Sequence, residues 1–179
     1  MTEIEAIIAH YQLEPLDQEG GFFKQVWCSP RRVANHLLGT DYPVGNTHPM
    51  GTLIHFLITA DSFSAMHRLP TVEHWFHHLG DAIEMLVLKE DGSGELVEIG
   101  PDFRQGQNIH YATPERSWQG SRVRSGGAHG WALGSCVMVP GFEWTDFELG
   151  DESKLCHEYP AFRSAIKARC RDKPVDGTL

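Results

Sequence analysis

The sequence predicts an all-β protein, an antiparallel sandwich or barrel with helices only at its two ends. Between residues 52 and 139, eight short stretches carry the composition and alternation of strands. They are 52–59, 63–67, 73–78, 83–89, 96–99, 109–113, 118–123 and 131–139. Turn sequences such as Asp91-Gly92-Ser93-Gly94 separate the stretches, and no helical period intervenes. This order favours hairpin-connected strands over βαβ units.

The two ends of the chain have helical patterns. Residues 2–13 begin with Thr2 and Glu5 at the spacing of a capping box, and one face collects the apolar residues Ile4, Ile7, Ile8 and Tyr11. At the other end, residues 151–171 open with Asp151, which can cap a first turn. Both helical segments are expected to pack against the β-structure.

Two further segments lie between the helices and the main run of strands. Gly20-Gly21 precedes a first strand at 22–27, and residues 29–50 read as a long irregular loop in which His36 and His48 are solvated. Residues 142–150 form a last strand or an extended arm. We therefore expect one domain over 1–179, and its three parts are an N-terminal helix (1–14), a barrel (20–149) and a C-terminal helical segment (151–171).

Composition narrows the class of protein. The chain has 179 residues and a formal net charge of −9, which disfavours a nucleic-acid or anionic-membrane surface. Its longest apolar runs, such as 53–60, are far too short to span a bilayer, and no basic segment followed by an apolar run marks a signal peptide. The four cysteines show neither C-x-x-C nor zinc-ribbon spacing. A cytoplasmic protein that binds neither nucleic acid nor membrane is expected.

Residues 63–88 concentrate the groups that can carry chemistry. Alternate side chains of a strand share a face, so Glu73, Trp75 and His77 lie on one side, and His74, Phe76 and His78 lie on the other. If the first set faces the interior, a carboxylate, an indole and an imidazole converge there, and His67 at the end of the preceding strand can join them. The second set is expected at the surface or at a dimer interface.

These residues carry a family resemblance. His67, Glu73 and Gly80 resemble the first motif of the cupin superfamily, and the stretch from Gly106 through Pro114 to Gln119 is similar to the second. Within that superfamily the chain resembles the small cupin-5 proteins, through EGGFF at 19–23, FSAMHR at 63–68, E-x-W-x-H at 73–77, P-x-x-x-W-Q at 114–119 and VPGFEWTDFEL at 139–149. The resemblance implies an RmlC-like jelly roll, a double-stranded β-helix, and a homodimer.

The sequence departs from metal-binding cupins at their ligand positions. Those proteins coordinate a metal with two His, one Glu and a further His, whereas Leu69 and Gln119 stand here at two of the His positions. Arg116 replaces the glycine of the second motif. A metal would have to use His67, Glu73, His77 and Gln119, a weak donor set, so we expect no metal cofactor.

Without a metal, the same residues predict a pocket for a small molecule. His67 is the candidate base and Glu73 its catalytic partner, while Trp75, His77, Trp118 and Gln119 are expected to line the pocket. Three hypotheses remain open. The first is a metal-independent epimerase or isomerase acting on a sugar or another small molecule, by analogy with metal-free sugar epimerases of the superfamily. The others are a non-catalytic ligand-binding or sensor protein, and a metal-dependent enzyme.

Overall fold

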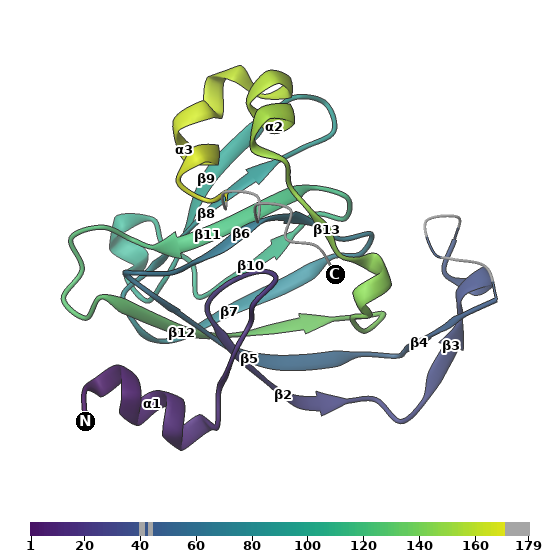
Figure 1. The fold of residues 1–179 in the computed structure, drawn as a ribbon, viewed down its shortest axis with the longest axis horizontal. Coiled ribbons are helices and arrows are strands. Elements are labelled where there is room, and N and C mark those ends of the chain that lie inside the picture. Colours follow the sequence, from purple (N-terminus) through teal and green to yellow (C-terminus); the bar gives the residue numbers. More distant parts are fainter. Residues whose placement is uncertain (40–41, 43–44, 171–179) are drawn as a thin grey trace, which may run out of the picture.

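The computed structural model describes residues 1–39, 42 and 45–170, and two antiparallel sheets form its body (Figure 1). The six-stranded sheet contains, in spatial order, β1 (Glu14–Pro15), β2 (Phe22–Cys28), β5 (Thr52–Thr59), β12 (Trp131–Met138), β7 (Glu73–Gly80) and β10 (His110–Thr113). The five-stranded sheet contains β13 (Glu148–Leu149), β6 (Phe63–Arg68), β11 (Trp118–Val123), β8 (Ile83–Leu88) and β9 (Gly94–Ile99). This arrangement confirms the all-β jelly roll, and each stretch predicted between 52 and 139 is a strand within a few residues of its predicted ends.

The main core lies between the two sheets. The six-stranded sheet contributes Phe56, Ile58, Trp75 and Cys136, and the five-stranded sheet contributes Ile83, Met85, Val87 and Val123. These residues alternate with outward-facing neighbours along their strands, as expected where one face of each sheet is buried. The same alternation decides which polar side chains point inward.

Helix α1 (Glu3–Tyr11) covers part of the outer face of the six-stranded sheet (Figure 1). Its predicted capping box is present, since Glu5 N–H donates to Thr2 Oγ1 at 3.2 Å and Thr2 N–H donates to Glu5 Oε2 at 2.8 Å. The predicted apolar face of the helix packs on Leu57, Trp131 and Leu133. The helix therefore buries apolar surface that the sheet would otherwise expose.

The C-terminal helical segment covers the outer face of the five-stranded sheet. It consists of α2 (Glu152–Glu158), the 3₁₀ turn η4 (Pro160–Phe162) and α3 (Arg163–Lys167), and the Asp151 side chain accepts the Lys154 N–H as the predicted cap. Its apolar side chains Leu155, Tyr159 and Ile166 pack on Met66, Leu86, Leu88 and Trp118. Residue 171, the predicted end of the segment, lies outside the described residues. No helix in the described part of the chain has the length and apolar character of a membrane span.

The expected irregular loop at 29–50 is instead partly ordered into a projecting arm. Strands β3 (Arg32–Ala34) and β4 (Thr47–Pro49) pair with each other, the 3₁₀ turn η1 (Asn35–Leu37) follows β3, and the arm extends away from the two sheets (Figure 1). His36 is exposed as expected, but the prediction for His48 was wrong, because this residue is only 1% exposed. Its Nδ1 lies 2.6 Å from Asn35 Oδ1 and its Nε2 donates to Asp146 Oδ2 at 2.7 Å.

Asp146 belongs to the segment that follows the last long strand. Residues 142–150 do not form a long strand, because the 3₁₀ turn η3 (Trp144–Asp146) interrupts them before the two-residue β13. A further 3₁₀ turn, η2 (Phe103–Gln105), lies between β9 and β10. The arm and residues 142–147 meet through the His48–Asp146 contact, which joins segments 98 residues apart in sequence.

Candidate functional site

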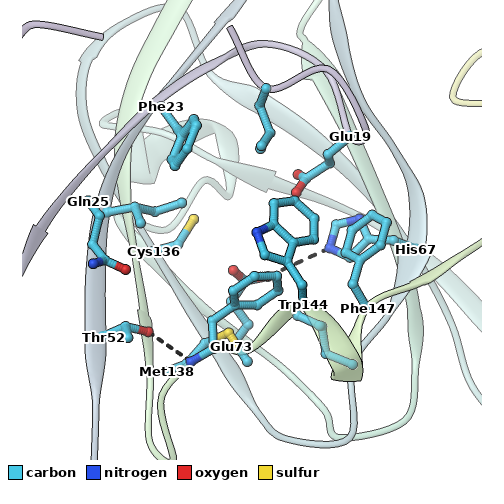
Figure 2. A pocket seen from close by; sticks show the side chains of 14 residues that line it. Glu19, Phe23, Gln25, Thr52, His67, Glu73, Cys136, Met138, Trp144 and Phe147 are labelled. Carbon is cyan, nitrogen blue, oxygen red and sulfur yellow. Dashed lines mark hydrogen bonds and ion pairs between the residues drawn. The ribbon is translucent and has the colours of Figure 1, made fainter. Parts of the chain in front are cut away.

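A cavity of about 110 Å³ opens between the two sheets (Figure 2). Its polar or titratable lining residues are Glu19, Gln25, Thr52, His67, Glu73 and Cys136. The apolar lining residues are Leu16, Phe23, Ile54, Leu69, Met138, Phe142, Trp144 and Phe147. Apolar side chains therefore make up most of the wall, and the polar groups are few.

His67 reaches the cavity from β6, on the face that it shares with Ala65. The side chain is 2% exposed, and its Nδ1–H donates to the Ala65 carbonyl at 2.8 Å. Because that carbonyl can only accept, the neutral ring carries its lone pair on Nε2. Burial lowers the pKa of His67, although the Glu73 carboxylate opposes this effect. The neutral form with a basic Nε2 is thus the favoured one.

Glu73 is the first residue of β7, and it points inward toward His67. Its Oε2 accepts hydrogen bonds from Trp75 Nε1 at 3.1 Å and from Gln119 Nε2 at 2.5 Å, and it lies 4.0 Å from His67 Nε2. Burial raises the pKa of Glu73, and the nearby Glu19 carboxylate raises it further, while His67 and the two donors act in the opposite direction. Burial therefore favours the uncharged forms of both His67 and Glu73.

Gln119 joins these two groups, and its orientation is fixed by a tryptophan. An indole N–H can only donate, so the 3.2 Å contact from Trp75 Nε1 identifies the facing atom of Gln119 as its carbonyl oxygen. Thr113 Oγ1 donates to the same oxygen at 2.7 Å. The amide nitrogen must then face Glu73 Oε2 and His67 Nε2, at 2.5 and 3.2 Å.

Glu19 is a second carboxylate at the cavity, and sequence reasoning assigned it no role. Gly20 and Gly21 follow it with φ of 111° and 69°, and a Cβ at Gly21 would lie 2.7 Å from the Leu57 carbonyl. These glycines permit a tight turn, which brings Glu19 next to β6. There the backbone carbonyl of Glu19 accepts the Ala65 N–H, and its side-chain Oε1 accepts a hydrogen bond from Ser64 Oγ at 2.5 Å. The EGGFF stretch at 19–23 was the available signal.

Aromatic side chains of residues 142–147 form another wall that sequence reasoning did not assign to the site. Phe147 stacks on His67, with ring centroids 5.1 Å apart and an interplanar angle of 20°. Trp144 packs edge-on against Phe142 and Phe147, at centroid distances of 5.0 and 5.5 Å. Figure 2 shows Trp144 and Phe147 on the His67 side of the cavity. Their signal was the VPGFEWTDFEL stretch at 139–149.

Two contacts with the arm hold this aromatic wall in place. Arg32 of β3 pairs with Glu143 at 2.5 Å, and His48 of β4 bonds Asp146 at 2.7 Å. Burial raises the pKa of Asp146, whereas its hydrogen bond to His48 lowers it. The two contacts flank Trp144 in the sequence, so the arm fixes the backbone on both sides of the indole.

None of the four predicted pocket residues is among the described residues that line this cavity, although Gln119 contacts His67 and Glu73, which do. Trp118 and Gln119 are neighbours on β11, so their side chains point to opposite faces, and Trp118 packs under the C-terminal helices. His77 shares a strand face with Glu73 but lies four residues along β7, about 13 Å away. There its Nε2–H donates to the Asp81 carbonyl at 2.9 Å. Trp75 lies behind Glu73, packed edge-on against Phe56.

The remaining histidines of the central stretch are on the opposite face of the six-stranded sheet. His74 Nδ1 lies 3.0 Å from His110 Nε2, and the rings stack. His78 and His55 both contact the Ser135 hydroxyl, at 2.7 and 3.1 Å. The alternation of β7 thus separates these imidazoles from the cavity.

The donor set of the cavity does not fit the metal site of metal-binding cupins. Leu69 lines the cavity with an apolar side chain, and the amide nitrogen of Gln119 presents N–H groups to Glu73 and His67 instead of a lone pair. His77, the alternative nitrogen ligand, is elsewhere. Among the described residues, no group of three or more His, Cys, Asp or Glu is arranged to hold a metal ion.

The turn before Gln119 has a backbone conformation that glycine favours, although arginine occupies the position. Arg116, which stands at the glycine position of the second cupin motif, has φ of 61°, in the left-handed region that glycine favours. Its backbone N–H donates to the Leu69 carbonyl at 2.9 Å. The replacement of glycine by arginine has therefore not displaced Gln119 from the site.

Comparisons with known proteins agree with this architecture. The family model described as "Cupin_5: Cupin superfamily (DUF985)" matches residues 5–150. A hypothetical protein from Leishmania major is 30% identical, with a TM-score of 0.83 over 96% of this chain and 100% of that one. A Shewanella oneidensis protein of known crystal structure is 24% identical, with a TM-score of 0.80 over 97% and 100% of the two chains.

More distant structures share the fold alone. A cupin 2 conserved barrel domain protein from Rhodopseudomonas palustris is 13% identical, with a TM-score of 0.53 over 86% of this chain and 81% of that one. No protein with a curated description matches the chain. The chain belongs to the Cupin_5 (DUF985) family of the cupin superfamily.

Proposed function

We propose that the protein binds a small organic molecule in the cavity and that His67 and Glu73 exchange protons with it, as a metal-independent isomerase or epimerase. The observation that carries the proposal is the pairing of a basic His67 Nε2 with the Glu73 carboxyl 4.0 Å away inside an apolar cavity. Proton transfer at carbon needs a base on one side and an acid within reach of the same substrate.

The electrostatics of the cavity support these roles. Burial lowers the pKa of His67 and raises the pKa of Glu73, so a neutral imidazole faces a carboxyl group that retains a proton more readily than in water. The neutral imidazole can accept a proton, and the protonated carboxyl can donate one. The stacked Phe147 ring and the Ala65 carbonyl hold the imidazole in one orientation and one tautomer.

The volume of the cavity limits the size of the ligand. An apolar cavity of about 150 Å³ holds a benzene molecule, and the present cavity measures about 110 Å³. A ligand that places about four or five non-hydrogen atoms in the cavity is therefore proposed. The bulk of a nucleotide sugar would have to remain outside.

A non-catalytic binding or sensor function is the second candidate. Its specific support is the hydrogen bond from Gln119 Nε2 to His67 Nε2 at 3.2 Å, which occupies the lone pair that a base must use. In that case His67, Glu73 and Gln119 would form a static polar network under the ligand. In the catalytic case, substrate binding must displace this bond.

The test begins with a thermal-shift screen of sugars, hydroxy acids, amino acids and amines of suitable size. Each ligand that binds is then incubated in deuterium oxide with the protein, and NMR follows exchange of its carbon-bound protons. We expect exchange that His67→Gln and Glu73→Gln abolish and that His36→Ala, at an exposed histidine of the arm, leaves intact. Binding without exchange in the unsubstituted protein would reject catalysis and favour the sensor.

We also propose that the protein is a homodimer. Support comes from large apolar side chains on the surface, among them Trp27 of β2, Met50 and Val139, each about half or more exposed. Analytical ultracentrifugation tests this proposal. A monomeric mass across the micromolar range would reject it.

A further inference from the structure

We infer that the cavity selects a small organic cation, an alkylammonium ion of about four or five non-hydrogen atoms. The inference deepens the proposed function, because it concerns the same cavity and adds the charge of the ligand. It rests on the charge of the lining residues, the direction of their hydrogen bonds and the aromatic walls.

The charged groups at the cavity have one sign. Glu19 and Glu73 both line it, and among the described lining residues none is Lys or Arg. The two carboxylates are close enough for Glu19 to raise the pKa of Glu73. Burial favours the protonated form of Glu73 in the empty cavity. A bound cation would stabilise the carboxylate forms of both groups, whereas an anion would add to their repulsion.

The hydrogen bonds within the protein leave acceptors facing the ligand. The N–H groups around Glu73 and His67 already donate to these two residues. Trp75 Nε1 and the amide of Gln119 both donate to the Glu73 carboxylate. The same amide also donates to His67 Nε2. The remaining Nδ1–H of His67 donates to the Ala65 carbonyl. What this end of the cavity offers is therefore carboxylate oxygen, which matches the N–H groups of an ammonium ion. The lone pair of His67 Nε2 is already occupied by Gln119.

Aromatic rings stand where the rest of the cation would lie. Phe23 comes from β2 on one side, and Trp144 and Phe147 come from residues 142–147 on the other (Figure 2). Phe142 also lines the cavity. A cation over an aromatic face is attracted by the electrons of the ring, and the attraction grows when water is excluded. Alkyl groups next to the charge find the same rings as apolar contacts.

An inorganic cation fits the same groups poorly. The amide nitrogen of Gln119 lies between His67 Nε2 and Glu73 Oε2, and Trp75 prevents the amide from turning its oxygen toward them. Most of the other lining groups are hydrocarbon and supply no ligand atoms. An organic ammonium ion uses both the acceptors and the apolar wall.

The test compares ligands of matched shape and different charge by isothermal titration calorimetry. The matched linear set is butylammonium, 1-butanol and butyrate. Zinc chloride alone tests the inorganic alternative. We expect butylammonium to bind at least about tenfold more tightly than 1-butanol, with butyrate weakest.

Two conservative variants assign the effect to the carboxylates. Glu19→Gln retains an oxygen that can accept from Ser64, and Glu73→Gln retains one that can accept from Gln119 and Trp75. Each is expected to weaken butylammonium binding about tenfold or more and to leave 1-butanol binding within about twofold. Glu14→Gln, at an exposed carboxylate that pairs with Lys24 outside the cavity, is the matched control and should change neither. Circular dichroism melts verify that every variant is folded.

Several outcomes would overturn the inference. Equal affinity for butylammonium and 1-butanol would do so, and so would tighter binding of butyrate than of butylammonium. Stoichiometric zinc binding that Glu73→Gln abolishes, or no binding of any probe at millimolar concentration, would also overturn it. These results are separable from the proposed catalysis. Selective ammonium binding without proton exchange would support this inference and reject the isomerase. Proton exchange in a neutral or anionic ligand would support the isomerase and reject this inference.

Discussion

Replacement of Gln119 by leucine is the sharpest test of the polar network, because this residue connects both candidate catalytic groups. Gln119 is 2% exposed and makes four hydrogen bonds, to His67, Glu73, Trp75 and Thr113. Leucine has a similar volume and no polar atom, so Gln119→Leu removes all four bonds without a large cavity. We expect the fold to persist with a lower free energy of unfolding.

The decrease in the free energy of unfolding follows from the hydrogen-bond partners that Gln119 leaves behind. A buried hydrogen bond to a charged group is worth about 1.5–3 kcal/mol and one between neutral groups about 0.5–1.5 kcal/mol. Trp75 Nε1 keeps its bond to Glu73, but Glu73 loses the shorter of its two hydrogen bonds. The Nε2 atom of His67 loses its hydrogen-bond donor. Thr113 retains only a 3.6 Å contact to the Met85 sulfur. Added apolar burial returns about 1 kcal/mol. The net loss is about 3 kcal/mol.

The loss should grow with pH. In the folded protein the pKa of Glu73 is raised above 4.5, so the stability that this group contributes is present below pH 4.5 and is lost as the pH rises through the folded-state pKa. Gln119 limits that loss, because its bond to Glu73 lowers the same pKa. Without it the pKa rises further, and the difference between variant and parent widens at high pH.

Urea unfolding followed by tryptophan fluorescence, in a pH series from about 5 to about 9, measures both effects. Gln107→Leu is the matched control, since Gln107 also donates to a carboxylate, that of Glu98, which keeps its ion pair with Arg124. It also removes the acceptor of the Asp102 N–H, so the same ranges give a cost of about 2 kcal/mol. A loss below about 1 kcal/mol for Gln119→Leu, or one that stays constant with pH, would refute the network as described.

Three further predictions follow from other parts of the structure. The double substitution Leu69→His and Gln119→His should create stoichiometric zinc binding, measured by calorimetry and elemental analysis, because Leu69 lines the cavity and Gln119 contacts both His67 and Glu73. A metal-free product would contradict the assignment of these positions. Asp146→Asn, which weakens the bond to the buried imidazole of the arm, should speed hydrogen exchange of the amides at 144–147, and unchanged exchange would show that this bond does not hold the segment. Gly127→Ala places a methyl group against the Asp81 carboxylate and should lower the free energy of unfolding by about 1–3 kcal/mol in urea titrations, with a neutral effect contradicting the packing.

The parts of the fold that depend on local pattern were predictable from the sequence. Alternation along 73–78 correctly placed Glu73 and Trp75 on one face of the strand and His74 and His78 on the other, because successive side chains of a strand point to opposite faces. The same rule could have excluded Trp118, since its neighbour Gln119 points inward. Periodicity does not show where along the strand the cavity lies. His77 was therefore expected at the cavity, although its side chain does not reach it.

The residues that sequence reasoning missed are placed by contacts between distant segments. Glu19 reaches the cavity because its carbonyl accepts the N–H of Ala65, far along the chain. His48 is buried because Asp146 and Asn35 bond both of its ring nitrogens. Neither partner is implied by composition or spacing around these positions, so a loop histidine and a turn glutamate looked ordinary.

The two contacts between the arm and residues 142–147 have a kinetic consequence. Arg32–Glu143 and His48–Asp146 hold the wall that carries Trp144, so widening the cavity at that wall requires both contacts to break. Among the described residues of the arm, none lines the cavity. A substitution that weakens either contact would lower the free-energy cost of opening the cavity at this wall, so a ligand would both enter and leave faster.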